Sequence, residues 1–286
     1  MLAASHHRDH LSPCCHCKAT PPGSFLDMSH FLLKHKKYLG QHFLQDAGVV
    51  RQFVESLSFG SSYQTIVEIG PGTGALTELL IEKSVHHELY LVEADRTLAA
   101  YLEHTYPSLQ NHIFATDFLS LELDKLFGGP IAIIGNLPYN RASQILFKLL
   151  AHRSQVQEVV CMVQKEFAER MAAKPGSKVY GVPSVLLQAF YTIEYLFTVA
   201  PTQCKPPPKV HSAVVRLQRN EVDQLFCDEK AFFKVVKTGF GQRRKKLRSA
   251  LRPLGISEDL LDLAMLEQRA EQLTVADFVA LTQEIT

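Results

Sequence analysis

Apolar residues never run long enough without interruption to cross a membrane, because no run approaches the roughly 18 residues that a spanning helix needs. We therefore expect a soluble, cytoplasmic protein with no membrane partner. Cysteine is also scarce, with six among 286 residues, which excludes a disulfide scaffold and favours reduced thiols. The formal net charge is only +1, so a nucleic-acid partner would have to be bound by a local basic patch.

The N-terminal stretch, residues 1–30, shows no regular pattern. Metal-ligating side chains gather there, at His6, His7, His10, Cys14, Cys15, His16 and Cys17. Zinc sites normally pair such ligands across a loop, and this cluster has no second half, so we predict no metal site. Residues 21–23 read Pro-Pro-Gly and no apolar signal segment is present, which predicts a disordered extension with Met28 as a candidate start.

Residues 131–139 join an apolar strand to a turn with unusual chemistry. The run Ile-Ala-Ile-Ile-Gly is followed by Asn136, Leu137, Pro138 and Tyr139. The Asn136 side chain and the Leu137 carbonyl can accept hydrogens from the exocyclic amine of a planar base, whose lone pair is otherwise delocalised. Tyr139 can stack on that base. Asn-x-Pro is also ordinary turn chemistry, so these four candidate catalytic residues need support from elsewhere in the chain.

A glycine-rich loop follows an earlier predicted strand, at residues 65–69. Gly70, Gly72 and Gly74 are spaced Gly-x-Gly-x-Gly, whereas a dinucleotide site has Gly-x-Gly-x-x-Gly. Glycines allow a sharp turn and close approach of the backbone to a ligand. The spacing looks like the loop that binds S-adenosylmethionine.

Acidic residues end the next two predicted strands. Glu93 follows the apolar strand that begins at Glu88, and Asp117 follows a strand near residue 112. An acid in the first position can accept hydrogen bonds from both ribose hydroxyls, and one in the second suits an adenine amine. Either acid by itself is also typical of a strand end that is exposed to solvent. Together with the glycine loop and Asn136, they predict a site for a nucleoside sulfonium cofactor and an amine substrate.

A basic segment lies near the C-terminus. Residues 234–252 contain eight lysines or arginines and no acid, a composition that favours contact with phosphate over a solvated charged face. The candidate residues for contact with nucleic-acid phosphates are Lys234, Lys237, Arg243, Arg244, Lys245, Arg248 and Arg252. We expect a helix with Phe233, Val236, Phe240, Leu247 and Leu251 on its packed face. Gly239 and Gly241 weaken this helix, and Pro253 should end it.

The whole pattern predicts an α/β fold with a doubly wound, mainly parallel sheet. Asp46 can cap a helix whose inner face is Val49, Val50, Phe53, Val54 and Leu57. Strands are expected near residues 65, 89, 112, 131 and 159, and residues 185–190 and 213–217 as later strands or a helix and a strand. After Arg219 we expect only helices, over 225–240, 244–251, 260–266 and 275–284.

Five ordered motifs resemble those of the bacterial small-subunit (16S) ribosomal RNA adenine N6,N6-dimethyltransferases. They lie at residues 36–44, 67–80, 136–140, 206–214 and 242–245. The resemblance implies a Rossmann-like class I methyltransferase domain over residues 31–218 and a smaller all-helical RNA-binding domain over residues 219–286. It implies S-adenosylmethionine as cofactor, with contacts at His42, Leu44, Gly70, Glu93, Asp117 and Asn136, and with Gly72 in the same loop.

The family dimethylates two adjacent adenosines in a hairpin near the 3′ end of the small-subunit RNA, in an immature 30S particle. We expect the same of this chain, acting as a monomer. Alternatives are an adenine methyltransferase acting on large-subunit RNA or DNA, and a non-catalytic RNA-binding assembly factor. The chain departs from the family at His42 and Gly241, where asparagine is common, and at Cys204, where the family usually has a phenylalanine that helps to sandwich the target base.

Overall fold

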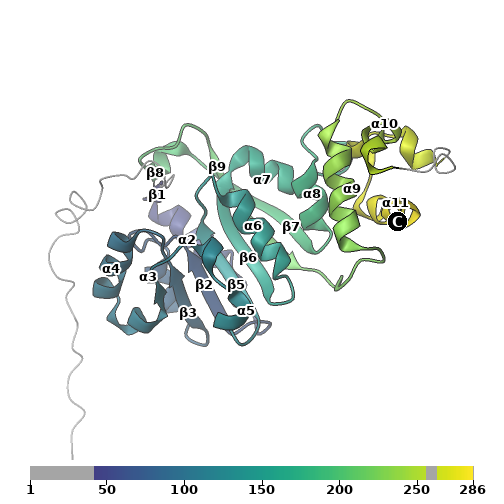
Figure 1. The fold of residues 1–286 in the computed structure, drawn as a ribbon. Coiled ribbons are helices and arrows are strands. Elements are labelled where there is room, and N and C mark those ends of the chain that lie inside the picture. Colours follow the sequence, from purple (N-terminus) through teal and green to yellow (C-terminus); the bar gives the residue numbers. More distant parts are fainter. Residues whose placement is uncertain (1–41, 256–262, 286) are drawn as a thin grey trace, which may run out of the picture. The chain divides into compact units, whose positions relative to one another are not determined.

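The computed structural model describes residues 42–255 and 263–285 (Figure 1). The predicted extension at residues 1–30, with the question of Met28, lies outside these ranges. So do residues 36–41 of the first motif and residues 260–262, the start of the helix expected at 260–266. Among the described residues, no helix is long and apolar enough to cross a membrane.

A seven-stranded sheet organises the chain (Figure 1). Its order is β4 (Ile113–Phe114), β3 (Glu88–Val92), β2 (Thr65–Ile69), β5 (Ile131–Asn136), β6 (Val156–Gln164), β9 (Ser212–Arg219) and β7 (Tyr191–Val199). The pairs from β4 to β6 are parallel, and β9 is antiparallel to both of its neighbours. The five predicted strands and the doubly wound arrangement are confirmed. A separate ribbon pairs β1 (Phe43–Leu44) with β8 (Cys204–Lys205).

The helices of the described chain are mostly short. The α-helices are α2 (Ala47–Glu55), α3 (Thr77–Lys83), α4 (Arg96–Thr105), α5 (Leu123–Leu126), α6 (Ala142–Ala151), α7 (Lys165–Met171), α8 (Val182–Gln188), α9 (Glu229–Gly241), α10 (Leu247–Ala250) and α11 (Val275–Ile285). Short 3₁₀ helices occur at Pro107–His112, Phe118–Ser120, Pro201–Gln203, Arg252–Leu254, Ala264–Glu267 and Ala270–Gln272. Asp46 caps α2 as predicted, since its side chain accepts from the Val49 amide at 2.9 Å.

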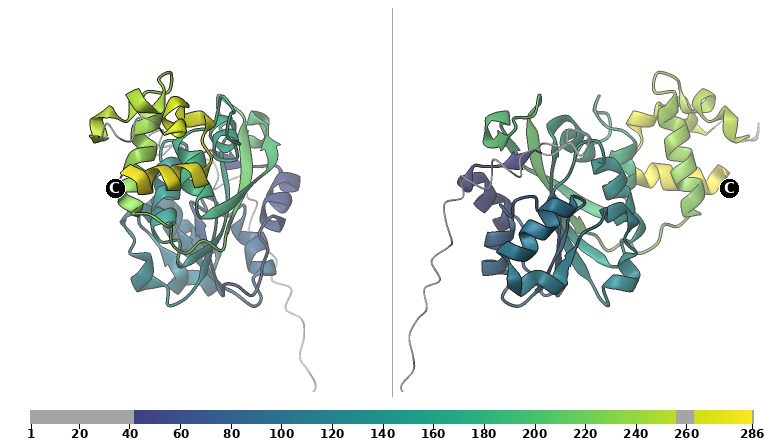
Figure 2. Two further views of the ribbon diagram at one scale, coloured as in Figure 1. Left: turned by 90° about the vertical axis from the view of Figure 1, so that its right-hand side faces the viewer. Right: turned by 60° about the vertical axis from the view of Figure 1, so that its left-hand side comes forward.

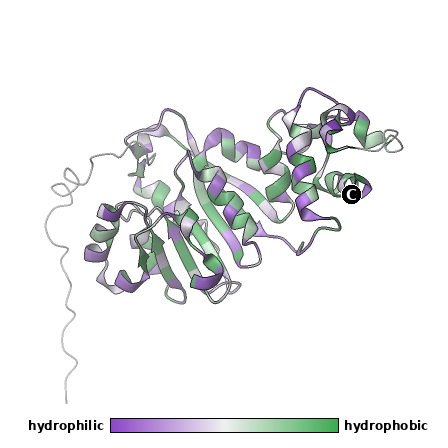
Figure 3. Cartoon of the chain, viewed as in Figure 1, coloured by the Kyte–Doolittle hydropathy of each residue, from purple (hydrophilic) through white to green (hydrophobic). Residues whose placement is uncertain are grey.

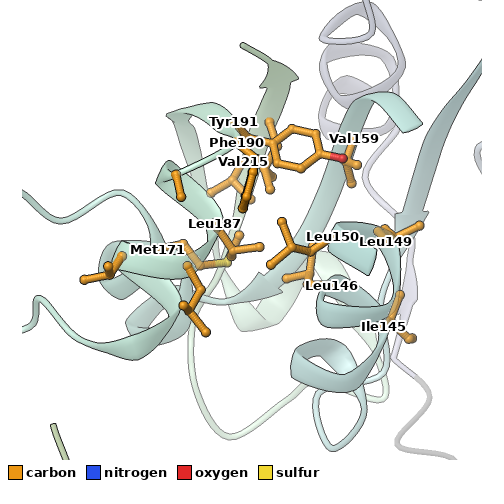
Figure 4. Close-up of a cluster of buried hydrophobic side chains, with 14 of the residues drawn as sticks. Ile145, Leu146, Leu149, Leu150, Val159, Met171, Leu187, Phe190, Tyr191 and Val215 are labelled. Carbon is orange, nitrogen blue, oxygen red and sulfur yellow. The ribbon is translucent and has the colours of Figure 1, made fainter. Parts of the chain in front are cut away.

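Alternation along the central strands divides the core between the two faces of the sheet. Val67 and Ile133 belong to one buried cluster, which also takes in α6, α7 and α8. Ile134 and Val160 belong to a second cluster, with the inner faces of α2, α3 and α4. Because both faces are covered, the central strands are mostly apolar, as Figure 3 shows. Figure 4 shows the first cluster where Leu146 and Leu150 of α6 lie near Leu187.

The C-terminal helices share the first cluster. Phe232 and Val235 of α9, Leu247 of α10 and Phe278 of α11 are all buried in it. α9 contacts both α8 and α11, and Figure 2 shows the C-terminal helices gathered together. The division of the chain at residue 219 stays a prediction.

One open alternative is settled, and two features of the secondary structure were not expected. A short apolar run does not by its period separate helix from strand. The alternative of a helix and a strand is confirmed, since residues 213–217 lie in β9 and residues 185–190 lie mainly in helix α8. The strand after it, β7, was not predicted, since its half-exposed edge position gives a mixed pattern. In the basic segment, α9 ends at Gly241 and α10 begins only at Leu247, so the helix expected from residue 244 is wrong over its first turn.

Candidate cofactor and substrate site

A cavity of about 220 Å³ opens at the carboxyl ends of the parallel strands, where the strand order reverses between β2 and β5. Its walls include most of the residues that the sequence predicted for the cofactor and the chemistry: His42, Gly70, Gly72, Glu93, Asp117, Asn136, Leu137, Pro138 and Tyr139. Leu44 is the exception. Its side chain is buried in the second core cluster and does not line the cavity.

The glycine loop joins β2 to α3 along one wall. Gly70, Gly72 and Gly74 have φ values of 68°, 61° and 89°, a left-handed conformation that favours glycine. A Cβ at Gly72 would lie 2.6 Å from the Phe43 ring, so this ring packs directly against the loop. Phe43 also lines the cavity. Sequence patterns assigned Phe43 no role beyond membership of a motif, because its partner is distant in the chain.

Glu93 is held at the end of β3 by two backbone amides. Oε2 accepts from the Gly72 amide at 3.0 Å and Oε1 from the Asp95 amide at 2.9 Å. The residue is only 3% exposed, and this burial raises the pKa of its carboxyl above the usual range despite the two amide donors. Glu93 thus ties the glycine loop to the neighbouring strand, and each carboxylate oxygen keeps a second lone pair for a ligand.

Asp117 follows β4 at another wall of the cavity. Oδ1 accepts from the Leu119 amide at 3.0 Å, and Oδ2 forms an ion pair with Arg141, which lies just before α6. Arg141 also lines the cavity. The sequence did not indicate this arginine, because it is 24 positions from its partner and belongs to no motif.

The orientation of the Asn136 side chain is fixed by a main-chain acceptor. Its Nδ2 donates to the carbonyl of His42 at 2.6 Å. A carbonyl can only accept, so the amide nitrogen must face His42 and Oδ1 is left as the acceptor. No residue in the described part of the chain donates to Oδ1. Asn136 therefore presents an acceptor at the cavity wall, as the substrate chemistry requires.

Tyr139 is positioned by contacts at both ends of its side chain. Its hydroxyl hydrogen-bonds the Ser212 hydroxyl at the start of β9, and its ring lies 5.4 Å from the His42 ring. Burial raises the pKa of Tyr139, so the phenol stays neutral. The His42 Nδ1 donates to the Pro206 carbonyl at 2.8 Å, which places the imidazole proton on Nδ1.

Cys204 lies in the β1–β8 ribbon, opposite Leu44. It is 4% exposed and belongs to the second core cluster, against which Phe197 also packs. It is near enough to Tyr139 to affect the pKa of the phenol, yet it is absent from the cavity lining.

Glu68 is a buried acid that sequence reasoning passed over. It lies in β2, 1% exposed, and accepts from the Thr77 hydroxyl at 2.7 Å. Burial, with the nearby Glu93 charge, raises the pKa of Glu68 to about 8. The bond joins the strand before the glycine loop to the helix after it. An acid within a short apolar strand was the available signal.

The basic segment is exposed, but its charges are not equally available. Lys234, Lys237, Arg244, Lys245 and Arg252 make no ion pair with any residue of the described ranges. Arg248 pairs with Glu267, and Arg243 lies 3.9 Å from Glu271 and donates to the Lys178 carbonyl. Residues 234–252 contain no acid, but Glu267 and Glu271, from later in the chain, lie beside these two arginines.

Clusters of three or more residues able to hold a metal ion do not occur within residues 42–255 and 263–285. The His and Cys cluster at residues 6–17 lies outside the described ranges, so the prediction of no metal site there stays open.

Comparison with known proteins identifies relatives along nearly the whole chain. A family model described as ribosomal RNA adenine dimethylase matches residues 32–286. A ribosomal RNA small subunit methyltransferase A of Cytophaga hutchinsonii is 48% identical over 254 residues, covering 89% of this chain and 98% of that protein. A protein of the same description from Parabacteroides distasonis is 49% identical over 253 residues, covering 88% and 94%.

Solved structures share the fold. A dimethyladenosine transferase from Plasmodium falciparum superposes with a TM-score of 0.71 at 24% identity, covering 84% of this chain and 96% of that one. The 23S rRNA methyltransferase ErmE gives a TM-score of 0.61 at 23% identity, covering 84% and 99%. At these identities the likeness shows the fold alone, and it confirms the predicted Rossmann-like methyltransferase sheet followed by helices.

Proposed function

Because the chain belongs to the ribosomal RNA adenine dimethylase family, we propose that it transfers methyl groups from S-adenosylmethionine to the N6 atoms of two adjacent adenosines. The substrate is the 3′-terminal hairpin of small-subunit ribosomal RNA, and the reaction accompanies assembly of the subunit. Curated relatives that are nearly half identical over almost their whole length support this reading.

The residues around the cavity fit this cofactor. Glu93 can accept from both ribose hydroxyls through its remaining lone pairs, and Asp117 can accept from the adenine amine. The glycine loop, with no Cβ at Gly72, allows the backbone to approach closely. When bound, S-adenosylmethionine supplies a methyl group on a positively charged sulfur, which makes that carbon electrophilic.

The orientation of Asn136 is the observation that carries the chemical part of the proposal. With Nδ2 held by the His42 carbonyl, Oδ1 accepts a hydrogen of the substrate N6 amine. The Leu137 carbonyl accepts the second hydrogen of the amine. With both N–H groups held by these acceptors, the lone pair of the nitrogen points toward the methyl donor. Reaction then depends on positioning more than on acid catalysis.

Tyr139 holds the base by stacking, because its ring is fixed by His42 and Ser212. No side chain needs to act as a strong base, since the methylated amine is acidic after transfer and loses its proton to water. The second transfer to the same nitrogen requires exchange of the cofactor and admission of monomethyladenosine to the same position.

The unpaired cations on and after α9 bind RNA phosphates in this proposal. Lys234, Lys237 and Lys245 are exposed and available, whereas Arg248 is partly neutralised by Glu267. The enzyme acts as a monomer on an immature 30S particle in the cytoplasm.

Transfer of tritiated methyl groups tests the proposal. We expect immature small subunits to accept about four methyl groups each, two on each adenosine, and large subunits and DNA to accept none. Mass spectrometry of the digested RNA should show N6,N6-dimethyladenosine at two adjacent positions. Labelling of large subunits or DNA in preference to small subunits would contradict the substrate, and labelling of none would contradict the enzymatic activity.

A further inference from the structure

A second cavity, of about 170 Å³, shares Tyr139 with the candidate cofactor cavity. It lies between the first turn of α6, the end of β6 and helix α7. Its other lining residues are Ala142, Ser143, Gln164, Glu166, Phe167 and Arg170. None of these six lines the first cavity, so the two cavities share Tyr139 alone.

The side chains of this cavity carry the groups that recognise a nucleobase. Gln164 is exposed, and neither its amide nitrogen nor its amide oxygen bonds to any residue of the described chain. The Ser143 hydroxyl is exposed and likewise lacks a partner among those residues. Phe167 is half-buried against the first core cluster, so its ring is held in place. An amide with both donor and acceptor, beside a fixed aromatic ring, suits the edge and face of an unstacked purine.

Arg170 adds a positioned cation to the rim. Its guanidinium donates to Glu166 at 2.9 Å within α7 and keeps 42% of its side-chain surface exposed. Such a pair holds the guanidinium in place and leaves its remaining N–H groups for a phosphate oxygen or the face of a base. Together, the Arg170 guanidinium and the Gln164 amide can contact the phosphate and the base edge of a single unstacked nucleotide.

We infer that this cavity binds the nucleotide next to the one being methylated, with Gln164 reading its base. The inference rests on the proposed function, in which the substrate is a pair of adjacent adenosines. When one adenine stacks on Tyr139 in the first cavity, the RNA backbone places the adjacent nucleotide one unit away. That position corresponds to the second cavity, on the other side of Tyr139. Glutamine pairs with adenine through two hydrogen bonds, so an adenosine neighbour is preferred.

The test combines a protein variant with an RNA variant. Wild-type enzyme and Gln164→Ala are compared on small subunits that carry both adenosines and on subunits in which one of the two is replaced by uridine. For the wild type, we expect the replacement to slow methylation of the remaining adenosine at least about fivefold, the lower range for one lost bidentate contact. For Gln164→Ala, we expect a slow rate on the native RNA and little further loss on the replaced RNA.

Gln144→Ala is the matched control. Gln144 is an exposed glutamine of α6, next to Ser143, and it lines neither cavity. It should behave as wild type, and all variants should bind S-adenosylmethionine equally by calorimetry. Equal slowing by the uridine replacement in wild type and Gln164→Ala would overturn the inference while leaving the methyltransferase activity intact. Absence of methylation by the wild type would instead count against the proposed function.

Discussion

The side-chain amide of Asn136 donates to the main-chain carbonyl of His42 at 2.6 Å, across 94 positions of the chain. Because this bond holds the amide nitrogen, the side-chain oxygen of Asn136 is the atom that faces the cavity. Asn136 lies at the end of β5, and His42 precedes the β1–β8 ribbon, so the acceptor for the substrate amine is set by a segment outside the main sheet.

Replacing Asn136 with alanine should lower turnover far more than it lowers binding. The lost acceptor acts on the attacking amine, and removal of one such group typically costs about 100- to 1,000-fold in kcat. Single-turnover methylation measures the effect, with cofactor and RNA affinities determined on the same protein. Near-normal turnover would remove Asn136 from the chemistry.

Replacing Glu93 with alanine should weaken S-adenosylmethionine binding by about 1.5–3 kcal/mol, because charge-assisted bonds to the ribose are lost. Burial raises the pKa of this carboxyl. As the pH is lowered, the wild type should therefore begin to lose affinity for S-adenosylmethionine at a higher pH than it would with a glutamate of ordinary pKa. Affinity should decline as pH falls, since the protonated carboxyl offers one acceptor fewer. Calorimetry from about pH 8 to about pH 5 checks this. Glu93→Gln should bind weakly with a flat pH profile.

Replacing Glu68 with glutamine should remove a pH dependence of stability. The pKa of Glu68 is raised from 4.5 to about 8, so between these values the folded protein holds a proton that the unfolded chain releases. This contribution to the free energy of unfolding is fully present below pH 4.5 and is lost as the pH rises through about 8. Relative to Glu68→Gln, the wild type should lose about 1.4 kcal/mol per pH unit in this window. Urea denaturation at several pH values measures the difference; parallel curves would mean that Glu68 is ionised.

Reversing Lys234 and Lys237 to glutamate should weaken binding to the small-subunit particle and reduce the salt dependence of affinity. Each lost phosphate contact lowers the slope of log K against log salt by about 0.9. Arg248→Ala should change the slope less, because Glu267 already pairs with that arginine. Cofactor binding serves as the folding control. An unchanged slope in the double variant would place the RNA elsewhere.

Replacing Cys204 with phenylalanine should destabilise the protein by about 1–3 kcal/mol, because a ring must enter a closed cluster. We expect single-turnover rates for both methyl transfers to be no faster than in the wild type. A faster first transfer would show instead that residue 204 reaches the base and that the ring adds stacking area.

The sequence predicted the parts of this site that follow strand ends. Gly70 and Glu93 come directly after an apolar strand, Asn136 completes one and Asp117 follows one within three residues, and parallel strands bring such positions to one edge. A local pattern was therefore enough. Helix α2 was equally predictable, since its cap and its apolar face lie within a few residues of each other.

Contacts between distant segments could not be predicted in the same way. Phe43 meets Gly72, Arg141 meets Asp117, and Glu267 meets Arg248 only because the chain folds back on itself. Composition gave the opposite impression in the last case, since the basic segment contains no acid of its own. Strand β7 was missed for a related reason: its burial is decided by one neighbour, β9, at the sheet edge.

The bond between His42 and Pro206 joins positions 164 apart. A chain emerging during its own synthesis can form β2, β3 and β5 long before Pro206 exists. His42 then lacks its partner, and the ribbon that fixes the carbonyl facing Asn136 has only one strand. Closing so long a loop is slow and comes late. A nascent chain should therefore form the parallel part of its sheet, from β4 to β6, first, and acquire its competence for methyl transfer only when nearly three-quarters of it has been made.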